Sequence, residues 1–382
     1  MEVKLPQSTR PLTDYLYRKS SVRKIPLSGT FELTPMCNFA CRMCYVRKTA
    51  QEVKAHDRPL LSKEQWLDIA REARDKGMIY LLLTGGEPFV RPDFWEIYEQ
   101  LSQMGFLISI NTNGSLIDSS VIERLKSMPP VRLNITLYGA SDETYERLCQ
   151  AKGVFAKVDR AITELQEAGF SLKLNCSLTP HNAHEIEEIH NYAVRHGLPI
   201  DITSYMFPPL RRDPSMIGQN DRFTPHEAAY YHLKRYLLHT GEEKYREYLK
   251  GITAGQIPQL GLDESCVDPV DGKIRCRAGS ASFWVTWDGW MTPCGMMPEP
   301  KEDLHQICFS DAWENIVRAS GELKLSGVCG RCPSKNVCHT CAAMAMAESG
   351  SVSGIPYYLC HMVQEMQKIA AEQLATGNYA GP

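Results

Sequence analysis

Residues 29–44 read GTFELTPMCNFACRMC, a short apolar segment that leads into three closely spaced cysteines. The segment Gly29–Leu33 is apolar and bounded by turn residues, which predicts a buried strand. Cys37, Cys41 and Cys44 follow it as CxxxCxxC. Three thiolates at this spacing can bind one side of a metal centre. The chain has 14 cysteines and no visible signal peptide, which favours metal or redox chemistry over disulfides.

The identity of this metal is narrowed by the number of ligands. A zinc site normally takes four, often in two separated pairs, and the next cysteine along the chain is Cys149. Three thiolates suit a [4Fe–4S] cluster in which one iron stays open. A zinc site completed by His56 or by a distant residue is one alternative. Unliganded core cysteines are the other.

Strand-like and helix-like segments alternate along the first half of the chain. Short apolar segments predict six strands, at Gly29–Leu33, Ile79–Thr84, Phe106–Asn111, Val131–Leu137, Ser171–Leu178 and Ile200–Tyr205. The predicted helices are Ser62–Lys76, Arg91–Gln103, Asp118–Lys126, Ser141–Leu148, Val154–Ala168 and Ala183–His196. Six β–α units in succession indicate an α/β fold with a parallel sheet, doubly wound or curled toward a barrel.

A second motif ends the second predicted strand, where residues 81–88 read LLLTGGEP. Glycines at this point let the backbone approach a ligand closely, because no Cβ is in the way. CxxxCxxC followed one β–α unit later by GGEP resembles the radical S-adenosylmethionine (radical SAM) superfamily. The resemblance implies a partial (β/α)6 TIM-like barrel. In that family SAM chelates the open iron, and an electron from the cluster cleaves SAM to a 5′-deoxyadenosyl radical.

The resemblance also implies which residues hold SAM. It assigns the methionine ammonium to the GGEP element, and the ribose and carboxylate to residues that end later strands. Met43 takes the place of an aromatic residue that contacts the adenine in many relatives, and Arg147 lies two positions from where many carry an arginine. The implied SAM contacts are Met43, Gly85, Gly86, Glu87, Pro88, Asn111, Asn113 and Ser177.

Eight further cysteines gather in the C-terminal part of the chain, enough for two complete Cys₄ sites. Their CxxC pairs lie five residues apart, much closer than in a zinc ribbon, although zinc remains an alternative. The pattern resembles the SPASM extension of radical SAM enzymes. That resemblance implies two auxiliary [4Fe–4S] clusters, one held by Cys266, Cys276, Cys294 and Cys341 and the other by Cys329, Cys332, Cys338 and Cys360.

Several further cysteines and tryptophans of the chain have a structural interpretation. Cys149, Cys176 and Cys308 are expected to be small core residues. The segment from Phe283 to Met291 predicts a hairpin that turns at Asp288-Gly289. Its tryptophans either shield a cluster by packing or form a wall of the substrate cavity; they are Trp284, Trp287 and Trp290.

Changes in composition suggest five regions. A proline-rich linker begins near residue 206, and a polar helix is predicted at about 225–250. The regions are an N-terminal extension (1–27), the radical SAM partial barrel (28–205), a bridging helical region (206–264), a SPASM auxiliary-cluster domain (265–365) and a C-terminal tail (366–382).

Charge and hydropathy exclude some classes of partner. The chain has 42 basic and 45 acidic residues and a net charge of −3, which argues against nucleic-acid or anionic-membrane binding. No apolar run reaches the roughly 18 residues that span a bilayer. We therefore expect a cytoplasmic protein.

The resemblance to SPASM enzymes defines the expected function more narrowly than the composition of the chain does. SPASM enzymes mostly modify ribosomally synthesised peptides, forming thioether or carbon–carbon cross-links or changing a side chain. We expect such a precursor peptide as substrate, and a reductant such as ferredoxin or flavodoxin. Fewer than 30 residues precede the first strand, so no leader-binding domain is expected there. Either a separate leader-recognition protein or recognition without a leader is then required. No catalytic acid or base is assigned.

Three alternatives to this function remain. One is a radical SAM enzyme for a non-peptide substrate, such as a tetrapyrrole decarboxylase of the haem-synthase type or a small-molecule dehydrogenase. Another is an enzyme like the anaerobic sulfatase maturases, which carry an aspartate where this chain has Gly295. The third is a non-catalytic iron–sulfur or zinc protein, which the GGEP element argues against.

Overall fold

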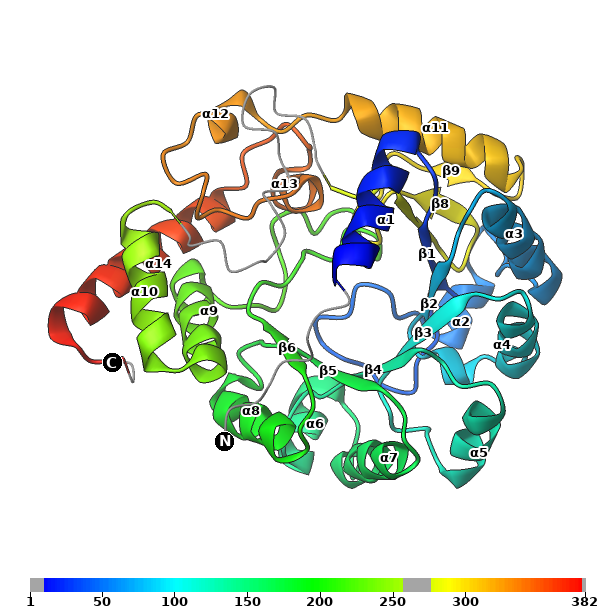
Figure 1. Cartoon of the computed structure of the whole chain (residues 1–382), viewed down its shortest axis with the longest axis horizontal. Helices are drawn as coiled ribbons and strands as arrows, with labels where there is room; N and C mark the ends of the chain where they lie inside the picture. The colour runs from blue at the N-terminus through cyan, green and yellow to red at the C-terminus, as the bar shows by residue number, and fades with distance from the viewer. Residues whose placement is uncertain (1–9, 257–275, 380–382) are drawn as a thin grey trace.

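The computed structural model describes residues 10–256 and 276–379. Their strands form one nine-stranded sheet in the order β6-β5-β4-β3-β2-β1-β7-β8-β9. The first six are parallel and follow one another round an open arc (Figure 1). They are β1 Ser28–Glu32, β2 Tyr80–Thr84, β3 Leu107–Thr112, β4 Arg132–Thr136, β5 Leu172–Ser177 and β6 Ile200–Thr203. The predicted α/β partial barrel is confirmed.

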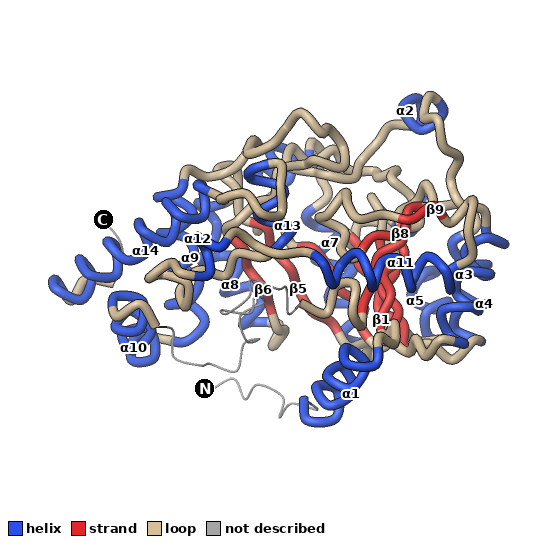
Figure 2. The backbone as a smooth tube through the Cα atoms, turned by 90° about the horizontal axis from the view of Figure 1, so that it is seen from above, coloured by secondary structure: helices blue, strands red, loops and turns tan. Residues whose placement is uncertain are grey.

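Helices cover the convex side of this arc and fill the C-terminal part (Figures 1 and 2). Those between the parallel strands are α2 Ala50–Lys54, α3 Lys63–Asp75, η1 Pro88–Val90, α4 Phe94–Gln103, α5 Ser119–Ser127, α6 Asp142–Cys149, α7 Phe155–Glu167, η2 Ala183–Glu185 and α8 Ile186–Arg195. The helices outside the barrel are α1 Arg10–Arg23, α9 Pro225–Thr240, α10 Glu242–Thr253, α11 Phe309–Glu322, α12 Gly327–Gly330, α13 Ala342–Ser349 and α14 Tyr357–Thr376.

The two faces of the sheet differ in polarity because side chains alternate along each strand. On the convex side, Phe31 packs against Trp66 of α3 with ring centroids 4.8 Å apart. The concave side carries polar side chains, among them Glu32, Thr84, Ser109, Asn111, Asn134, Thr136, Lys173, Asn175 and Ser177. A barrel with a packed interior is filled by branched apolar residues instead. The concave side of this barrel is therefore suited to hold polar ligands.

The sheet continues beyond the barrel through the predicted hairpin. Strands β7 (Ser282–Val285) and β8 (Trp290–Thr292) pair antiparallel, with Val285 opposite Met291. β9 (Glu302–Asp303) extends them. The sequence did not indicate that β7 would pair in parallel with β1, residue for residue from Ser28. This pairing places the turn after β7 at the same sheet edge as the cysteine loop after β1.

Three features outside the barrel differ from prediction. The helix expected at 225–250 is two helices, α9 and α10, because Gly241 between them has a φ of +76°. The 20-residue helix α14, which packs against both, was not predicted. Cys308 is exposed at the N-terminus of α11, so its prediction as a core residue is wrong, because the helix turns Phe309 inward instead.

A buried ion pair joins the linker after β6 to the concave side of the barrel. Both Nη atoms of Arg211 donate to the carboxylate of Glu32, at 2.7 and 2.9 Å, and Nη1 also donates to the carbonyl of Gly295. Trp284 Nε1 donates to the same carboxylate at 3.1 Å. These contacts tie β1, the linker and the loop after β8 to one another.

The ion pair generates a prediction with a neighbouring control. Arg211→Ala leaves the fully buried carboxylate of Glu32 without its counter-charge, so we expect a loss of about 3–5 kcal/mol of stability. Arg212 is exposed and makes a 3.4 Å contact with the carbonyl of Cys44, so Arg212→Ala should cost under about 0.5 kcal/mol. Anaerobic urea unfolding of both variants measures the difference, and equal losses would contradict the assignment.

Candidate active site

The ends of the first three parallel strands bring the predicted motifs together. Cys37 follows β1, Gly85 follows β2, and Asn113 follows β3. The carboxyl ends of parallel strands share one edge of the sheet, where barrel enzymes place their chemistry. The CxxxCxxC loop and the GGEP element are therefore neighbours in space.

The two glycines of GGEP lie directly against the cysteine loop. Gly86 N–H donates to the carbonyl of Thr34 at 2.7 Å, and Glu87 N–H donates to that of Met36 at 2.9 Å. A Cβ on Gly85 would lie 2.5 Å from the Thr34 oxygen, and one on Gly86 would lie 2.3 Å from the Met36 oxygen. The glycines are thus required by backbone packing between the motifs, a role that the sequence did not indicate.

Glu87 is fully buried and joins β2 to β3. Its carboxylate accepts from Thr112 Oγ1 at 2.9 and 3.0 Å and from Asn113 N–H at 2.8 Å. Burial raises the pKa of Glu87 to about 7, although these hydrogen bonds favour the ionised form. Pro88 begins the short helix η1 behind it and is also buried. Thr112, which the sequence analysis did not single out, holds this carboxylate in place.

Backbone N–H groups donate hydrogen bonds to two sulfurs of the first cysteine set, which consists of Cys37, Cys41 and Cys44. Phe39 N–H donates to Cys37 Sγ and Arg47 N–H to Cys44 Sγ, both at 3.3 Å. Hydrogen bonds to sulfur are one of the means by which proteins tune iron–sulfur clusters. Burial raises the pKa of the Cys37 thiol to about 12 and also that of Cys44. Binding of a metal to these thiols would therefore release their protons.

The pKa of Cys41 shifts in the opposite direction to those of Cys37 and Cys44, because a second cysteine donates a hydrogen bond to it. The pKa of Cys41 is lowered chiefly by a hydrogen bond from Cys149, with a further one from Tyr138. Cys149 is fully buried, as predicted for a core residue, yet its thiol contacts the cysteine loop. Cys176 is buried as predicted.

The remaining predicted SAM contacts occupy different positions around this edge. Asn111 lies on the concave side and accepts from Asn134 Nδ2 at 2.8 Å. Asn113 donates to Asn38 at 2.9 Å and lies 3.7 Å from Cys37 Sγ. Ser177 ends β5, and Met43 is buried in the core. Arg147 is on the outer side of α6, 41% exposed, where it pairs with Glu143.

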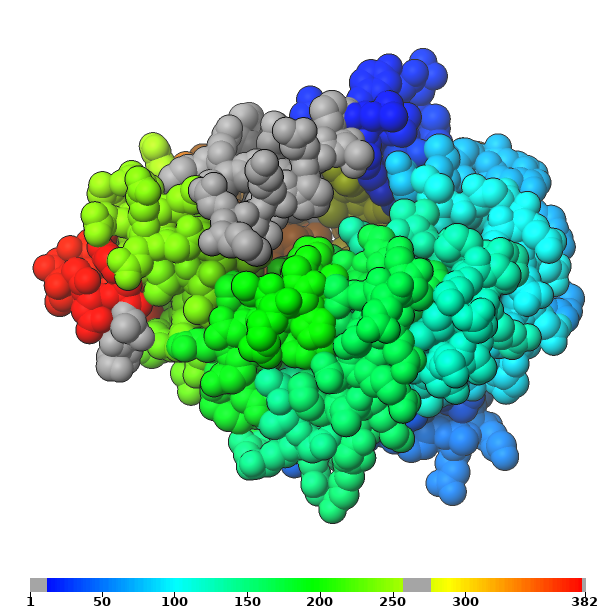
Figure 3. All heavy atoms as spheres, turned by 60° about the horizontal axis from the view of Figure 1, so that its bottom comes forward, coloured from blue at the N-terminus to red at the C-terminus, as the bar shows by residue number. Residues whose placement is uncertain are grey.

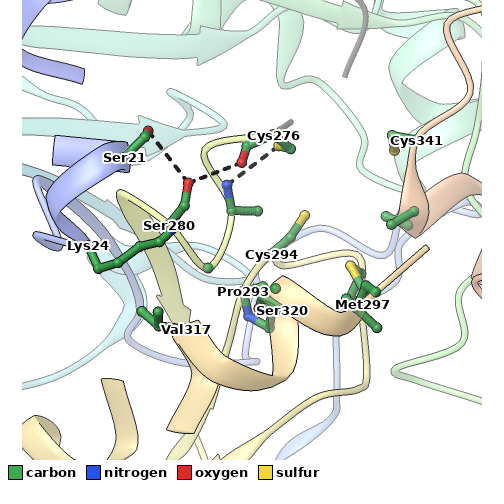
Figure 4. A pocket seen from close by; sticks show the side chains of 16 residues that line it. Ser21, Lys24, Cys276, Ser280, Pro293, Cys294, Met297, Val317, Ser320 and Cys341 are labelled. Atoms are coloured by element: carbon green, nitrogen blue, oxygen red, sulfur yellow. Dashed lines mark hydrogen bonds between the residues drawn. The ribbon is translucent and has the colours of Figure 1, made fainter. Parts of the chain in front are cut away.

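Three C-terminal cysteines line one cavity of about 280 Å³ (Figure 4). They are Cys276, Cys294 and Cys341. Burial raises the pKa of Cys294 to about 11, and the charges of Cys341 and Cys276 add to this effect. Ala278 N–H donates to Cys276 Sγ and Met296 N–H to Cys294 Sγ, both at 3.5 Å. A water occupies about 30 Å³, so the cavity has room for a group much larger than one ion.

Four other cysteines form a second group. Burial raises the pKa of Cys360, and the charges of Cys338, Cys329 and Cys332 raise it further. Burial likewise raises the pKa of Cys329, and the charges of Cys338 and Cys332 raise it further. The grouping of these seven cysteines is the one that the SPASM resemblance implies, but Cys266 lies outside the described residues.

In the part of the chain that the structure describes, no three His, Cys, Asp or Glu side chains converge on a single-ion site. The ligands of a four-iron cubane each bind a different iron, so they surround the cluster rather than converge. His56, the alternative zinc ligand, packs against Trp287 with the two rings tilted by 51° and lies 3.3 Å from Asp288.

The three tryptophans of the hairpin have different surroundings. Trp284 faces Glu32 and also covers Gly295, where a Cβ would lie 2.8 Å from the indole ring. Trp287 is buried. Trp290 lies between the cations of Arg58 and Lys301, 4.0 and 4.7 Å from its ring. Only Trp284 reaches the network on the concave side.

Comparison with known proteins decides the family. The model of the radical SAM superfamily matches residues 31–193. Mycofactocin maturase MftC from Mycolicibacterium smegmatis is 32% identical over 322 residues, which cover 82% of this chain and 77% of that protein. The chain belongs to the radical SAM superfamily. SAM and the [4Fe–4S] cluster of that superfamily are therefore its cofactors, and it is an enzyme.

This radical SAM enzyme is also similar to a heme synthase and, in fold, to two solved structures. AdoMet-dependent heme synthase from Methanosarcina barkeri is 27% identical over 335 residues, 84% of this chain and 92% of that protein. The structure of anSMEcpe with bound AdoMet matches with a TM-score of 0.68 at 18% identity, covering 92% of this chain and 99% of that chain. Streptococcus suis SuiB bound to its precursor peptide SuiA gives 0.64 at 15% identity, over 94% and 83%. No described helix is both long and apolar enough to cross a membrane.

Glu87 generates a pH prediction. Its pKa is raised from 4.5 to about 7, so between these values the folded chain retains a proton that the unfolded chain has lost. Stability linked to Glu87 therefore falls as pH rises through this window, by up to about 1.4 kcal/mol per pH unit, and is level above it. Unfolding free energies of the wild type minus those of Glu87→Gln should show this slope. A constant difference would contradict it.

The two groups of C-terminal cysteines are predicted to hold iron independently, so each can be lost without the other. Cys341→Ala should remove iron from the centre with Cys276 and Cys294, whereas Cys338→Ala should remove it from the centre with Cys329, Cys332 and Cys360. Each variant should keep about 8 of about 12 irons and should still cleave SAM. Mössbauer and EPR spectra identify which centre is lost. The same spectral loss in both variants would refute the grouping.

Proposed function

We propose that the chain oxidatively modifies a ribosomally synthesised peptide, by a thioether or carbon–carbon cross-link or a related side-chain change. Cys37, Cys41 and Cys44 hold the SAM-binding cluster. Cys266, Cys276, Cys294 and Cys341 hold one auxiliary [4Fe–4S] cluster, and Cys329, Cys332, Cys338 and Cys360 hold a second. The SAM contacts are Met43, Gly85, Gly86, Glu87, Pro88, Asn111, Asn113 and Ser177.

The observation that carries this proposal is the position of the cavity of Cys276, Cys294 and Cys341. Gly295, next to Cys294, is hydrogen-bonded to Arg211, which in turn is bound to Glu32 on the concave side. Glu32 ends β1, and the loop of Cys37 follows it. A substrate bound on the concave side would therefore have a cysteine centre on either side of it, and this arrangement supports the proposal.

An oxidative outcome suits this arrangement. When bound, SAM supplies a 5′-deoxyadenosyl radical that removes a hydrogen atom from the substrate. To form a new bond, the substrate must then lose one electron and one proton. The polar side chains of the concave side hold and orient the substrate, and the centre at Cys294 lies within the same network to receive the electron.

Decarboxylation of a tetrapyrrole, as in enzymes of the haem-synthase type, is the second candidate. It is favoured by the heme synthase of M. barkeri, which aligns over 92% of its own length. It also ends in the loss of one electron from a substrate radical, so the same centres serve it. A sulfatase-maturase function is less well supported, because an aspartate at position 295 would collide with Trp284.

Iron content and SAM cleavage test the first part of the proposal. Anaerobic reconstitution should give about 12 iron and 12 sulfide per chain. Replacing Cys37, Cys41 and Cys44 by Ala should leave about 8 iron and abolish formation of 5′-deoxyadenosine. Cys308→Ala is the matched control, since Cys308 is exposed and outside both groups, and it should change neither. Zinc without labile sulfide would refute the proposal.

Product analysis tests the substrate. A short peptide encoded beside this chain, co-expressed with it, should lose the mass of two hydrogen atoms for each cross-link. Loss of carbon dioxide from an added tetrapyrrole, with the peptide unchanged, would instead establish the haem-synthase alternative.

A further inference from the structure

The helix α1 presents a cationic outer surface. Arg18, Lys19 and Arg23 are all exposed, and none forms an ion pair with another residue in the described part of the chain. Asp14 is the one acidic residue of α1 and lies 3.5 Å from Arg277. The whole chain has a net charge of −3, so this concentration of positive charge is local. Figures 2 and 3 show α1 projecting at the edge of the molecule.

Apolar side chains are exposed among these cations. Leu12, Tyr15 and Val22 are 67%, 56% and 82% exposed. At 100° per residue they share one side of the helix with these three cations. We call this set the α1 surface; it consists of Leu12, Tyr15, Arg18, Lys19, Val22 and Arg23. Exposed apolar residues grouped among like charges are typical of a surface that binds a protein of opposite charge.

The opposite side of α1 faces the cysteine cavity. Ser20 is buried, and Tyr17 stacks on Tyr80 of β2. Ser21 and Lys24 line the cavity that also contains Cys294 (Figure 4). A helix with its side chains is about 10–12 Å thick. A protein bound to the α1 surface would therefore be separated from this cavity by little more than one helix.

We propose that the α1 surface binds an acidic one-electron carrier protein of the flavodoxin or ferredoxin type, which exchanges electrons with the centre of Cys276, Cys294 and Cys341. This inference rests on the proposed function, in which that centre receives one electron from the substrate radical. The oxidised carrier takes up that electron and is reduced by one electron, while the proton displaced when the substrate's new bond forms is released to solvent.

Charge reversal on the α1 surface tests the proposal. The chain with Cys37, Cys41 and Cys44 replaced by Ala should retain only the auxiliary clusters, and flavodoxin hydroquinone should bleach their absorbance in a stopped-flow experiment. Adding Lys19→Glu and Arg23→Glu should slow this reaction about tenfold or more at low ionic strength. The difference should largely vanish in 0.5 M salt, where charges are screened within about 4 Å.

Two controls separate binding from damage. Lys157→Glu with Arg160→Glu reverses two exposed cations on α7, across the barrel from α1, and should leave the rate unchanged. The neutral 5-deazaflavin radical should reduce all variants equally. The docking site alone is overturned by any of three results. Flavodoxin reduces the α1 variant as fast as its parent, deazaflavin also reduces the α1 variant more slowly, or flavodoxin reduces the α7 variant as slowly as the α1 variant. Failure of deazaflavin to bleach any auxiliary cluster overturns the proposed function as well.

Discussion

The ion pair between Glu32 and Arg211 lies where three parts of the chain meet. Glu32 ends β1, Arg211 comes from the linker after β6, and Gly295 and Trp284 come from the segment that extends the sheet. A buried carboxylate without its counter-charge is very unfavourable, so these segments stay together. The C-terminal cysteines are thereby held beside the concave side of the barrel, where a substrate would lie.

The SAM end of the site depends on backbone contact instead. Gly85 and Gly86 pack against carbonyls of the cysteine loop at distances that exclude a Cβ. Glu87, bound by Thr112 and Asn113, then fixes the ends of β2 and β3 relative to that loop. The two signature motifs of the superfamily are thus one packed unit, and a change in either one displaces the other.

Periodicity and turn residues were sufficient to predict the successive β–α units and a parallel sheet, because each unit closes locally and buries its own apolar stripe. The barrel was implied only by the resemblance that the CxxxCxxC and GGEP motifs carry. The helix α14 was missed, although its buried residues Leu359, Met362, Val363, Met366 and Ile369 recur at helical spacing. That spacing indicates a helix, but it does not indicate that the helix packs against α9 and α10. Cys308 was wrongly placed in the core for a related reason. A single residue at a helix start can point either way, and the orientation of α11 decides which.

The sequence by itself determined the family resemblance, the succession of β–α units and which cysteines are available as ligands, because these depend on short spacings within local segments. Only the tertiary structure decided that β7 joins β1, that Arg211 reaches Glu32, and that Cys276, Cys294 and Cys341 line one cavity. These contacts join residues that are far apart along the chain. Their formation depends on how whole elements pack, and no local pattern encodes it.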